Sequence, residues 1–81
     1  MPKVCEFYGI RIYLYFEDHP PPHFHALYGE YEAKVAIESL EIIAGHLPTR
    51  AQAMVNEWAI ARRADLRRAW QQASGPQPID P

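Results

Sequence analysis

The sequence predicts an α+β domain, in which a four- or five-stranded antiparallel sheet of two hairpins carries one long C-terminal helix on one face. Two observations carry this prediction. Apolar and polar residues alternate along most of residues 3–37, as in a strand, and from Pro48 apolar residues recur at three- and four-residue spacing, as in a helix. The 81 residues, 48% of them hydrophobic, suffice for one domain at residues 1–73, followed by a tail at 74–81 that we expect to be disordered.

The first hairpin is predicted from residues 3–8 and 10–17, which alternate on either side of Gly9. A two-residue turn at Tyr8-Gly9 brings an acidic and a basic residue opposite each other on the polar face, and this agreement supports the register. The expected pairs are Cys5 with Ile12, Glu6 with Arg11, and Phe7 with Ile10.

The second hairpin is predicted from residues 23–28 and 31–37, around a turn at Gly29-Glu30. Its expected pairs are Tyr28 with Tyr31, Ala26 with Ala33, His25 with Lys34, and Phe24 with Val35. A short fifth strand at residues 40–43 is expected to end at Gly45.

These registers divide the side chains between two faces of the sheet. The apolar face should meet the helix through Ile10, Ile12, Leu14, Phe16, Phe24, Ala26, Tyr31, Val35 and Ile37, packed on Met54, Val55, Trp58, Leu66 and Trp70. One helix cannot cover both faces. We therefore expect the opposite face to be open to water or covered by another chain, and it carries Tyr13, Tyr15, His23, His25, Leu27, Glu32 and Lys34.

The helix is expected to begin after Thr49, a candidate N-cap with Gln52 three residues later, and to end near Ala73. A break near residues 63–65 stays open, because Asp65 would suit the cap of a second helix.

Composition bounds the kind of protein. The formal charge of −2 argues against electrostatic capture of nucleic acid by the whole domain. The single cysteine excludes an intrachain disulfide, and neither a signal peptide nor a long apolar stretch is evident, so we expect a cytoplasmic protein.

Residues 18–25 hold three of the four histidines and three of the eight prolines. The prolines predict a rigid connector, from which His23 and His25, two residues apart on a strand, point the same way. They could ligate one divalent ion such as zinc or nickel, with His19 and Asp18 as further ligands. The alternative is that these histidines are structural or contact a partner.

Two weaker chemical sites can be identified. His25 beside Glu32 and Lys34 could transfer protons, although a short chain with one sheet offers little room for an enclosed pocket, so we do not expect an enzyme. Arg63 and Arg67 share a helical face that could contact phosphates, and the alternative is a solvated helix surface.

The sequence resembles the domain of unknown function 4160 family of small prokaryotic proteins. The resemblance rests on a few motifs: Met-Pro-x-Val followed by Phe7-Tyr8-Gly9, the run Asp18-His19-x-Pro21-Pro22-His23-x-His25, Glu32-Ala33-Lys34, and Trp58, Leu66 and Trp70. It implies a fold and a candidate site but no reaction. It also implies a neighbouring small protein, with a domain of unknown function 2442, in a toxin–antitoxin-like pair.

The leading functional hypothesis is a protein-interaction or regulatory module that uses the open sheet face around the histidine motif. Its contacts with a small partner protein or a second copy would come from Tyr13, Tyr15, Pro21, Pro22 and Leu27. The alternatives are a metal-binding protein or metal-dependent hydrolase or nuclease using His19, His23 and His25, and a nucleic-acid-binding regulator.

Overall fold

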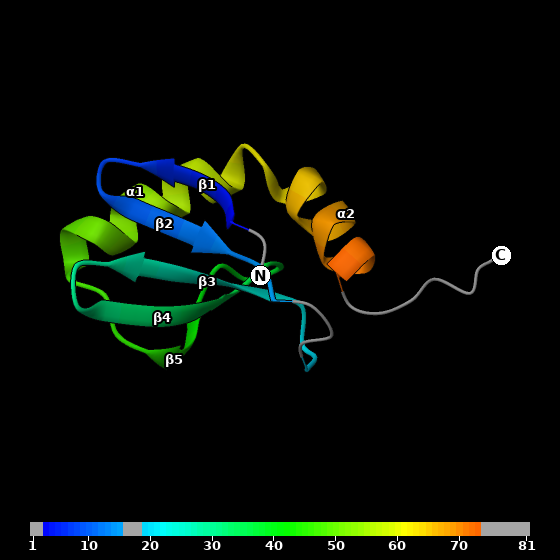
Figure 1. Cartoon of the computed structure of the whole chain (residues 1–81), viewed down its shortest axis with the longest axis horizontal. Helices are drawn as coiled ribbons and strands as arrows, with labels where there is room; N and C mark the ends of the chain where they lie inside the picture. Colours follow the sequence, from blue (N-terminus) through cyan, green and yellow to red (C-terminus); the bar gives the residue numbers. More distant parts are fainter. Residues whose placement is uncertain (1–2, 16–18, 74–81) are drawn as a thin grey trace, which may run out of the picture.

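A five-stranded antiparallel meander followed by two helices makes up the fold (Figure 1). The computed structural model describes residues 3–15 and 19–73. The elements in chain order are β1 (Lys3–Phe7), β2 (Ile10–Tyr13), β3 (His23–Tyr28), β4 (Tyr31–Ala36), β5 (Ile42–Gly45), α1 (Thr49–Ile60) and α2 (Arg63–Ala73). The predicted class, α+β, is confirmed. The chain has no helix in this described part that could cross a membrane.

The strands lie in the order β1-β2-β3-β4-β5, so the predicted hairpins are joined into one sheet by the pairing of β2 with β3. Every cross-strand pair predicted for the two hairpins is present. The β1–β2 turn has positive φ at both central residues, 50° at Tyr8 and 79° at Gly9, as a type I′ hairpin turn requires. The tight turns therefore fix the register that the sequence predicted.

Strand boundaries differ from the prediction by one residue at the ends of β1 and β4, and by more at β2 and β5. The second strand, expected over residues 10–17, ends at Tyr13, because Leu14 and Tyr15 follow it outside the strand, and residues 16–17 lie outside the described residues. The fifth strand is Ile42–Gly45, two residues later than expected. Leu40 has a φ of 61° and its N–H donates to the carbonyl of Ala36, and this turn delays the return of the chain to β4.

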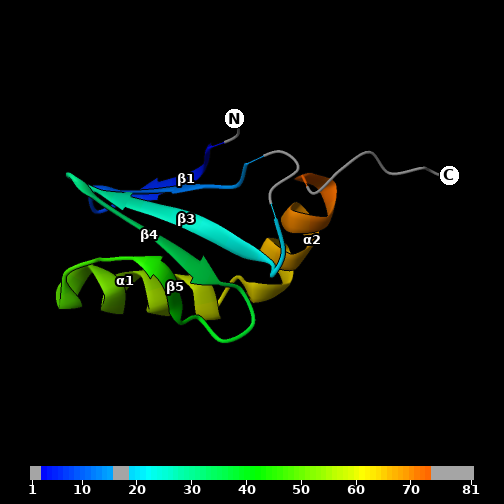
Figure 2. The same ribbon diagram turned by 90° about the horizontal axis from the view of Figure 1, so that it is seen from below.

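The prediction of one long helix is wrong, because the chain turns at residues 61–62 between α1 and α2. A straight helix over residues 49–73 would be about 37 Å long, whereas strands of four to six residues span only about 13–20 Å. The break keeps the second helix beside the sheet. Figure 2 shows α1 beneath the strands and α2 rising past their end.

The predicted capping box is also wrong. Thr49 is the first helical residue, and Pro48 holds the N-cap position without a side-chain hydrogen bond to the helix. The carbonyl of Pro48 accepts the N–H of Gln52, which closes the first helical turn. Pro48 has a φ of −58° and a ψ of 151°, an extended conformation that leads directly into the helix.

The core lies between the helices and the face of the sheet that was predicted to be apolar. Its buried residues are Ile10, Ile12, Leu14, Phe24, Ala26, Ala33, Val35, Ile37, Leu40, Leu47, Ala51, Val55, Ala59, Leu66 and Trp70, with Met54 and Trp58 partly buried against them. Tyr31, expected in the core, is 39% exposed at the β3–β4 turn, where its ring lies against His46. Phe16, also expected there, lies outside the described residues.

The close approach of β5 to β4 generates the first prediction. A Cβ at Gly45 would lie 2.2 Å from the carbonyl oxygen of Glu32, whereas a Cβ at Gly29 would meet nothing within 4 Å, and both glycines have positive φ. We expect Gly45→Ala to lower the free energy of unfolding by about 3 kcal/mol and Gly29→Ala by about 1 kcal/mol. Urea unfolding followed by circular dichroism measures both, and equal losses would contradict the clash.

Candidate functional site

The two histidines of the Pro-rich motif lie side by side at the start of β3, on the face opposite α1. Their ring centroids are 5.0 Å apart, so the sequence correctly placed both on one face. The expectation that this part of the face is open to water or covered by another chain is wrong, because His23 is 3% exposed and His25 is 5% exposed. The chain covers them itself.

Aromatic side chains from two distant segments provide this cover. The ring of Tyr15, which follows β2, meets His25 edge-on at 4.2 Å and stacks on Tyr13 at 6.2 Å. Trp70 of α2 lies 5.2 Å from the ring of His23 and is itself 9% exposed. The break between the helices is what brings Trp70 around the end of the sheet to this position.

The proline connector orients His23. The Nδ1 atom of His23 donates a hydrogen bond to the carbonyl oxygen of Pro21 at 2.7 Å, because a carbonyl can only accept, so Nδ1 carries a proton. The carbonyl of Pro22 accepts the N–H of Ile37 at 3.0 Å, which ties the same connector to the end of β4.

The weak catalytic candidates are brought together as predicted. Lys34 is the cross-strand partner of His25 and is exposed, and the Nδ1 atom of His25 lies 3.5 Å from a carboxylate oxygen of Glu32. A carboxylate beside an imidazole can fix its tautomer or exchange a proton with it. Because the ring of His25 is buried under Tyr15, this arrangement favours a positioning contact over proton transfer to a substrate.

The described residues add no support to the hypothesis of a metal site. Among residues 3–15 and 19–73, no three side chains of the types His, Cys, Asp and Glu lie close enough to share an ion. His19 is exposed, whereas His23 and His25 are buried, and Asp18 lies outside the described residues. Zinc or nickel binding by this set stays a prediction.

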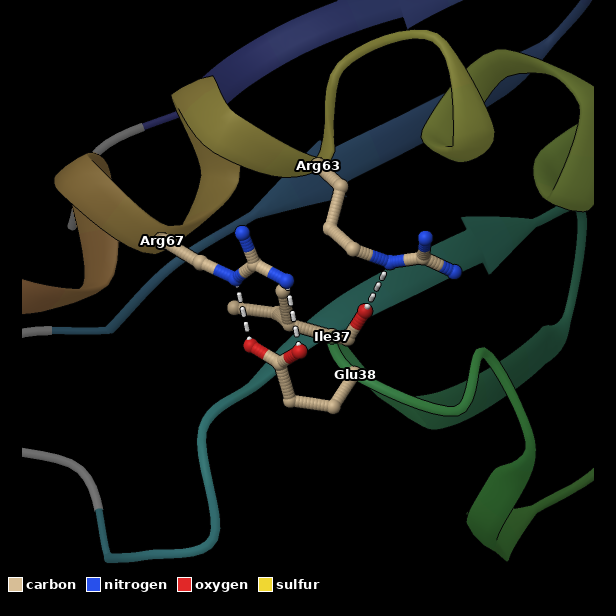
Figure 3. Close-up of polar contacts among 4 residues, drawn as sticks. All are labelled: Ile37, Glu38, Arg63 and Arg67. Carbon is tan, nitrogen blue, oxygen red and sulfur yellow. Dashed lines mark hydrogen bonds and ion pairs between the residues drawn. The ribbon is translucent and has the colours of Figure 1, made fainter.

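The arginines predicted to contact phosphates both hold α2 against the β4–β5 connection (Figure 3). The guanidinium of Arg67 makes two hydrogen bonds to the carboxylate of Glu38, of 2.6 and 2.7 Å. Arg63 Nε donates to the carbonyl of Ile37 at 3.1 Å. We call these contacts the α2 clamp. Nucleic-acid binding by the two residues stays a prediction, and the structure gives each of them a role within the chain.

The clamp shifts the titration of its acidic member. The two hydrogen bonds from Arg67 hold the pKa of Glu38 below its ordinary value of 4.5, and the positive charges of Arg67 and Arg63 act in the same direction. Both side chains of the ion pair are more than half exposed, so solvent screens the interaction. The clamp therefore orients α2, while burial of Leu66 and Trp70 supplies most of its attachment.

The residues predicted to bind a partner differ in accessibility. Tyr13, Tyr15 and Leu27 are half-buried on the face opposite α1, Pro21 is exposed, and Pro22 is half-buried. Arg11 precedes Tyr13 by two residues and lies on the same face, and sequence reasoning missed its proximity to Leu27, its partner on β3. Sequence reasoning also missed the cover that Trp70 gives to His23, because that contact depends on where the helix breaks.

The clamp predicts a pH-dependent contribution to stability. Because the pKa of Glu38 is lowered by folding, its contribution is present above pH 4.5 and is lost as the pH falls through the lower pKa of the folded chain. We expect Glu38→Gln to lower the melting temperature at neutral pH, and the difference from wild type to vanish in acid. The control is Glu41→Gln, an exposed carboxylate of the same connection, and a pH-independent effect of Glu38→Gln would contradict the assignment.

Burial of the histidine pair predicts selective chemical modification. In the folded chain, diethyl pyrocarbonate should modify the exposed His19 and His46 and spare His23 and His25, as mass spectrometry of peptides would show. Trp70→Ala should make His23 reactive at a cost of about 3 kcal/mol. Trp58→Ala removes an equal indole from α1 and should leave His23 protected. Equal modification of all four histidines in the wild type would contradict the burial.

One family model matches the chain, and it covers residues 9–71, which include the histidine motif, the whole sheet after β1 and nearly all of both helices. No curated protein and no solved structure shows significant similarity to the chain. The matching model is described only as a domain of unknown function, so it adds no activity to the geometry. A match of this extent, over most of the 81 residues, places the chain in the family Domain of unknown function (DUF4160).

Proposed function

We propose that this protein is a protein-interaction module that binds a small partner protein through the sheet face opposite α1. The single observation that supports the proposal is the one-sided cover of the sheet, apart from the contact of Trp70 with His23 at the start of β3. In the described part of the chain, both helices lie beneath or beyond the strands, and no helix lies on the other face (Figure 2). An antiparallel sheet tolerates water on one face. The residues on that face therefore decide whether it is solvated or binds a partner.

The centre of this face is more apolar than a solvated sheet requires. Tyr13 on β2 and Leu27 on β3 are half-buried, and Tyr15 beside them is half-buried as well. Tyrosine is enriched where proteins meet, because its ring buries a large area while its hydroxyl keeps a hydrogen-bond partner. We define the contact patch by these three residues, with Arg11, Glu32 and Lys34 around them.

The surrounding charges favour a partner protein over an anionic polymer. Glu32 and Lys34 are exposed, and Arg11 lies opposite Glu6 on β1. Alternating signs around an apolar centre resemble the polar rim of a protein interface, whereas a nucleic-acid surface would be of one sign. The partner we propose is the second small protein of a toxin–antitoxin-like pair, which the family resemblance suggests.

The test is co-expression with the product of the adjacent gene, followed by titration calorimetry of the purified components. We expect a complex of defined stoichiometry, and we expect Leu27→Lys to weaken it at least tenfold, about 1.4 kcal/mol, because a charge would enter the apolar centre. Ala53→Lys places the same side chain at an exposed position of α1 and should leave affinity unchanged. If the two proteins do not associate, or if both variants bind as the wild type does, the proposal fails.

A further inference from the structure

A second candidate interaction surface runs along the outer edge of β1, on the other side of the sheet from β5. Within residues 3–15 and 19–73, β1 pairs with β2 alone, so it is an edge strand. Edge strands present backbone donors and acceptors that can pair with another strand, and natural proteins commonly protect them. This edge borders a groove between β1 and the junction of the two helices.

Two cavities form the groove. The first, of about 170 Å³, is lined by Cys5, Trp58, Arg62, Asp65 and Leu66. The second, of about 430 Å³, is lined by Phe7, Tyr8, Met54, Glu57, Trp58 and Arg62. They share Trp58 and Arg62 and follow β1 through Cys5 and Phe7, which are two residues apart and so lie on the same side of the strand.

Aromatic side chains make the groove apolar, and one of these side chains, Tyr8, is exposed to solvent. Phe7 stacks on Trp58 at 5.2 Å, and the guanidinium of Arg62 lies 5.5 Å from the centre of the Trp58 ring. Tyr8, at the tip of the hairpin, is 81% exposed although its positive φ would suit asparagine or glycine better. The buried Nε1–H of Trp58 has no acceptor within the described part of the chain.

We propose that two copies of this chain associate through the outer edges of β1, about a two-fold axis beside Cys5. Two antiparallel copies of one strand edge are self-complementary, as a two-fold interface requires. The charges at the cavity beside Cys5 are self-complementary too, because it is lined by one cation, Arg62, and one anion, Asp65. The axis relates the cavity beside Cys5 in one copy to the same cavity in the other, and in this arrangement Arg62 of one copy faces Asp65 of the other.

The intrachain contacts of Arg62 and Asp65 leave both side chains able to pair across the dimer interface. Asp65 accepts one hydrogen bond from Arg68 at 3.2 Å, and a carboxylate has further acceptor sites. Arg62 donates to the carbonyl of Trp58 through one Nη atom, and a guanidinium has five N–H groups. Both side chains are exposed in the single chain, and the dimer interface would bury them.

The single cysteine gives a direct test of the surface. Sedimentation velocity and light scattering should show a dimer, and mild oxidation or a short bismaleimide should link the wild-type chain through Cys5, because directly opposed residues of paired strands lie about 4.5–5.5 Å apart. Cys5→Ser should abolish the link while the dimer persists. A monomer at all concentrations overturns the proposal and leaves the groove to an extended peptide of another protein.

Exchanging the charges of Arg62 and Asp65 tests the position of the two-fold axis. Arg62→Asp should weaken the dimer at least tenfold, because it places two acidic groups opposite each other, and Arg62→Asp with Asp65→Arg should restore the dissociation constant to within about threefold of the wild type. A dimer that does not link through Cys5, or that Arg62→Asp leaves unchanged, uses another face and overturns the proposal. Leu27→Lys, on the opposite face of the sheet, should leave the dimer intact, so the outcome is separate from that of the proposed partner binding.

Discussion

The pairing of β3 with both of its neighbours is the constraint on which the rest of the structure depends. It places Phe24 and Ala26 in the core and His23 and His25 on the other face. A slip of one residue in this strand would exchange the two sets and bury two imidazoles against α1 in place of a phenyl ring and a methyl group. The free energy of apolar burial therefore holds the histidine pair in place on this face.

The second determinant is the length of the sheet. Strands of four to six residues are shorter than the amphipathic segment that follows them, so the segment can bury all its apolar residues only by turning. The turn at residues 61–62 gives α1 the face of the sheet and α2 its end. Trp70 then closes the core on one side and covers His23 on the other. The apolar surface of one indole is shared by the core and the candidate site.

The parts of the fold that could be predicted are those decided by near neighbours. The hairpin registers follow from the alternation of side chains and from turns at Tyr8-Gly9 and Gly29-Glu30, and both are present. The helix break and the burial of the histidines depend on contacts across long stretches of chain, such as that between His23 and Trp70, which periodicity does not contain. The capping prediction failed for a related reason, since Pro48 already sets the extended entry into α1.

The proline run in the histidine motif has a physical role that does not depend on its chemistry. Prolines lack N–H donors but keep their carbonyls, so they suit a position between groups that donate. Pro21 accepts from the ring of His23 and Pro22 from the backbone of Ile37, and Arg63 donates to the carbonyl of that same residue. The motif, the end of β4 and the start of α2 are thus one hydrogen-bonded junction. A ligand or partner that approached His23 from the side of Trp70 would displace that ring, and because α2 is fixed to this junction, binding there would be coupled to movement of the helix.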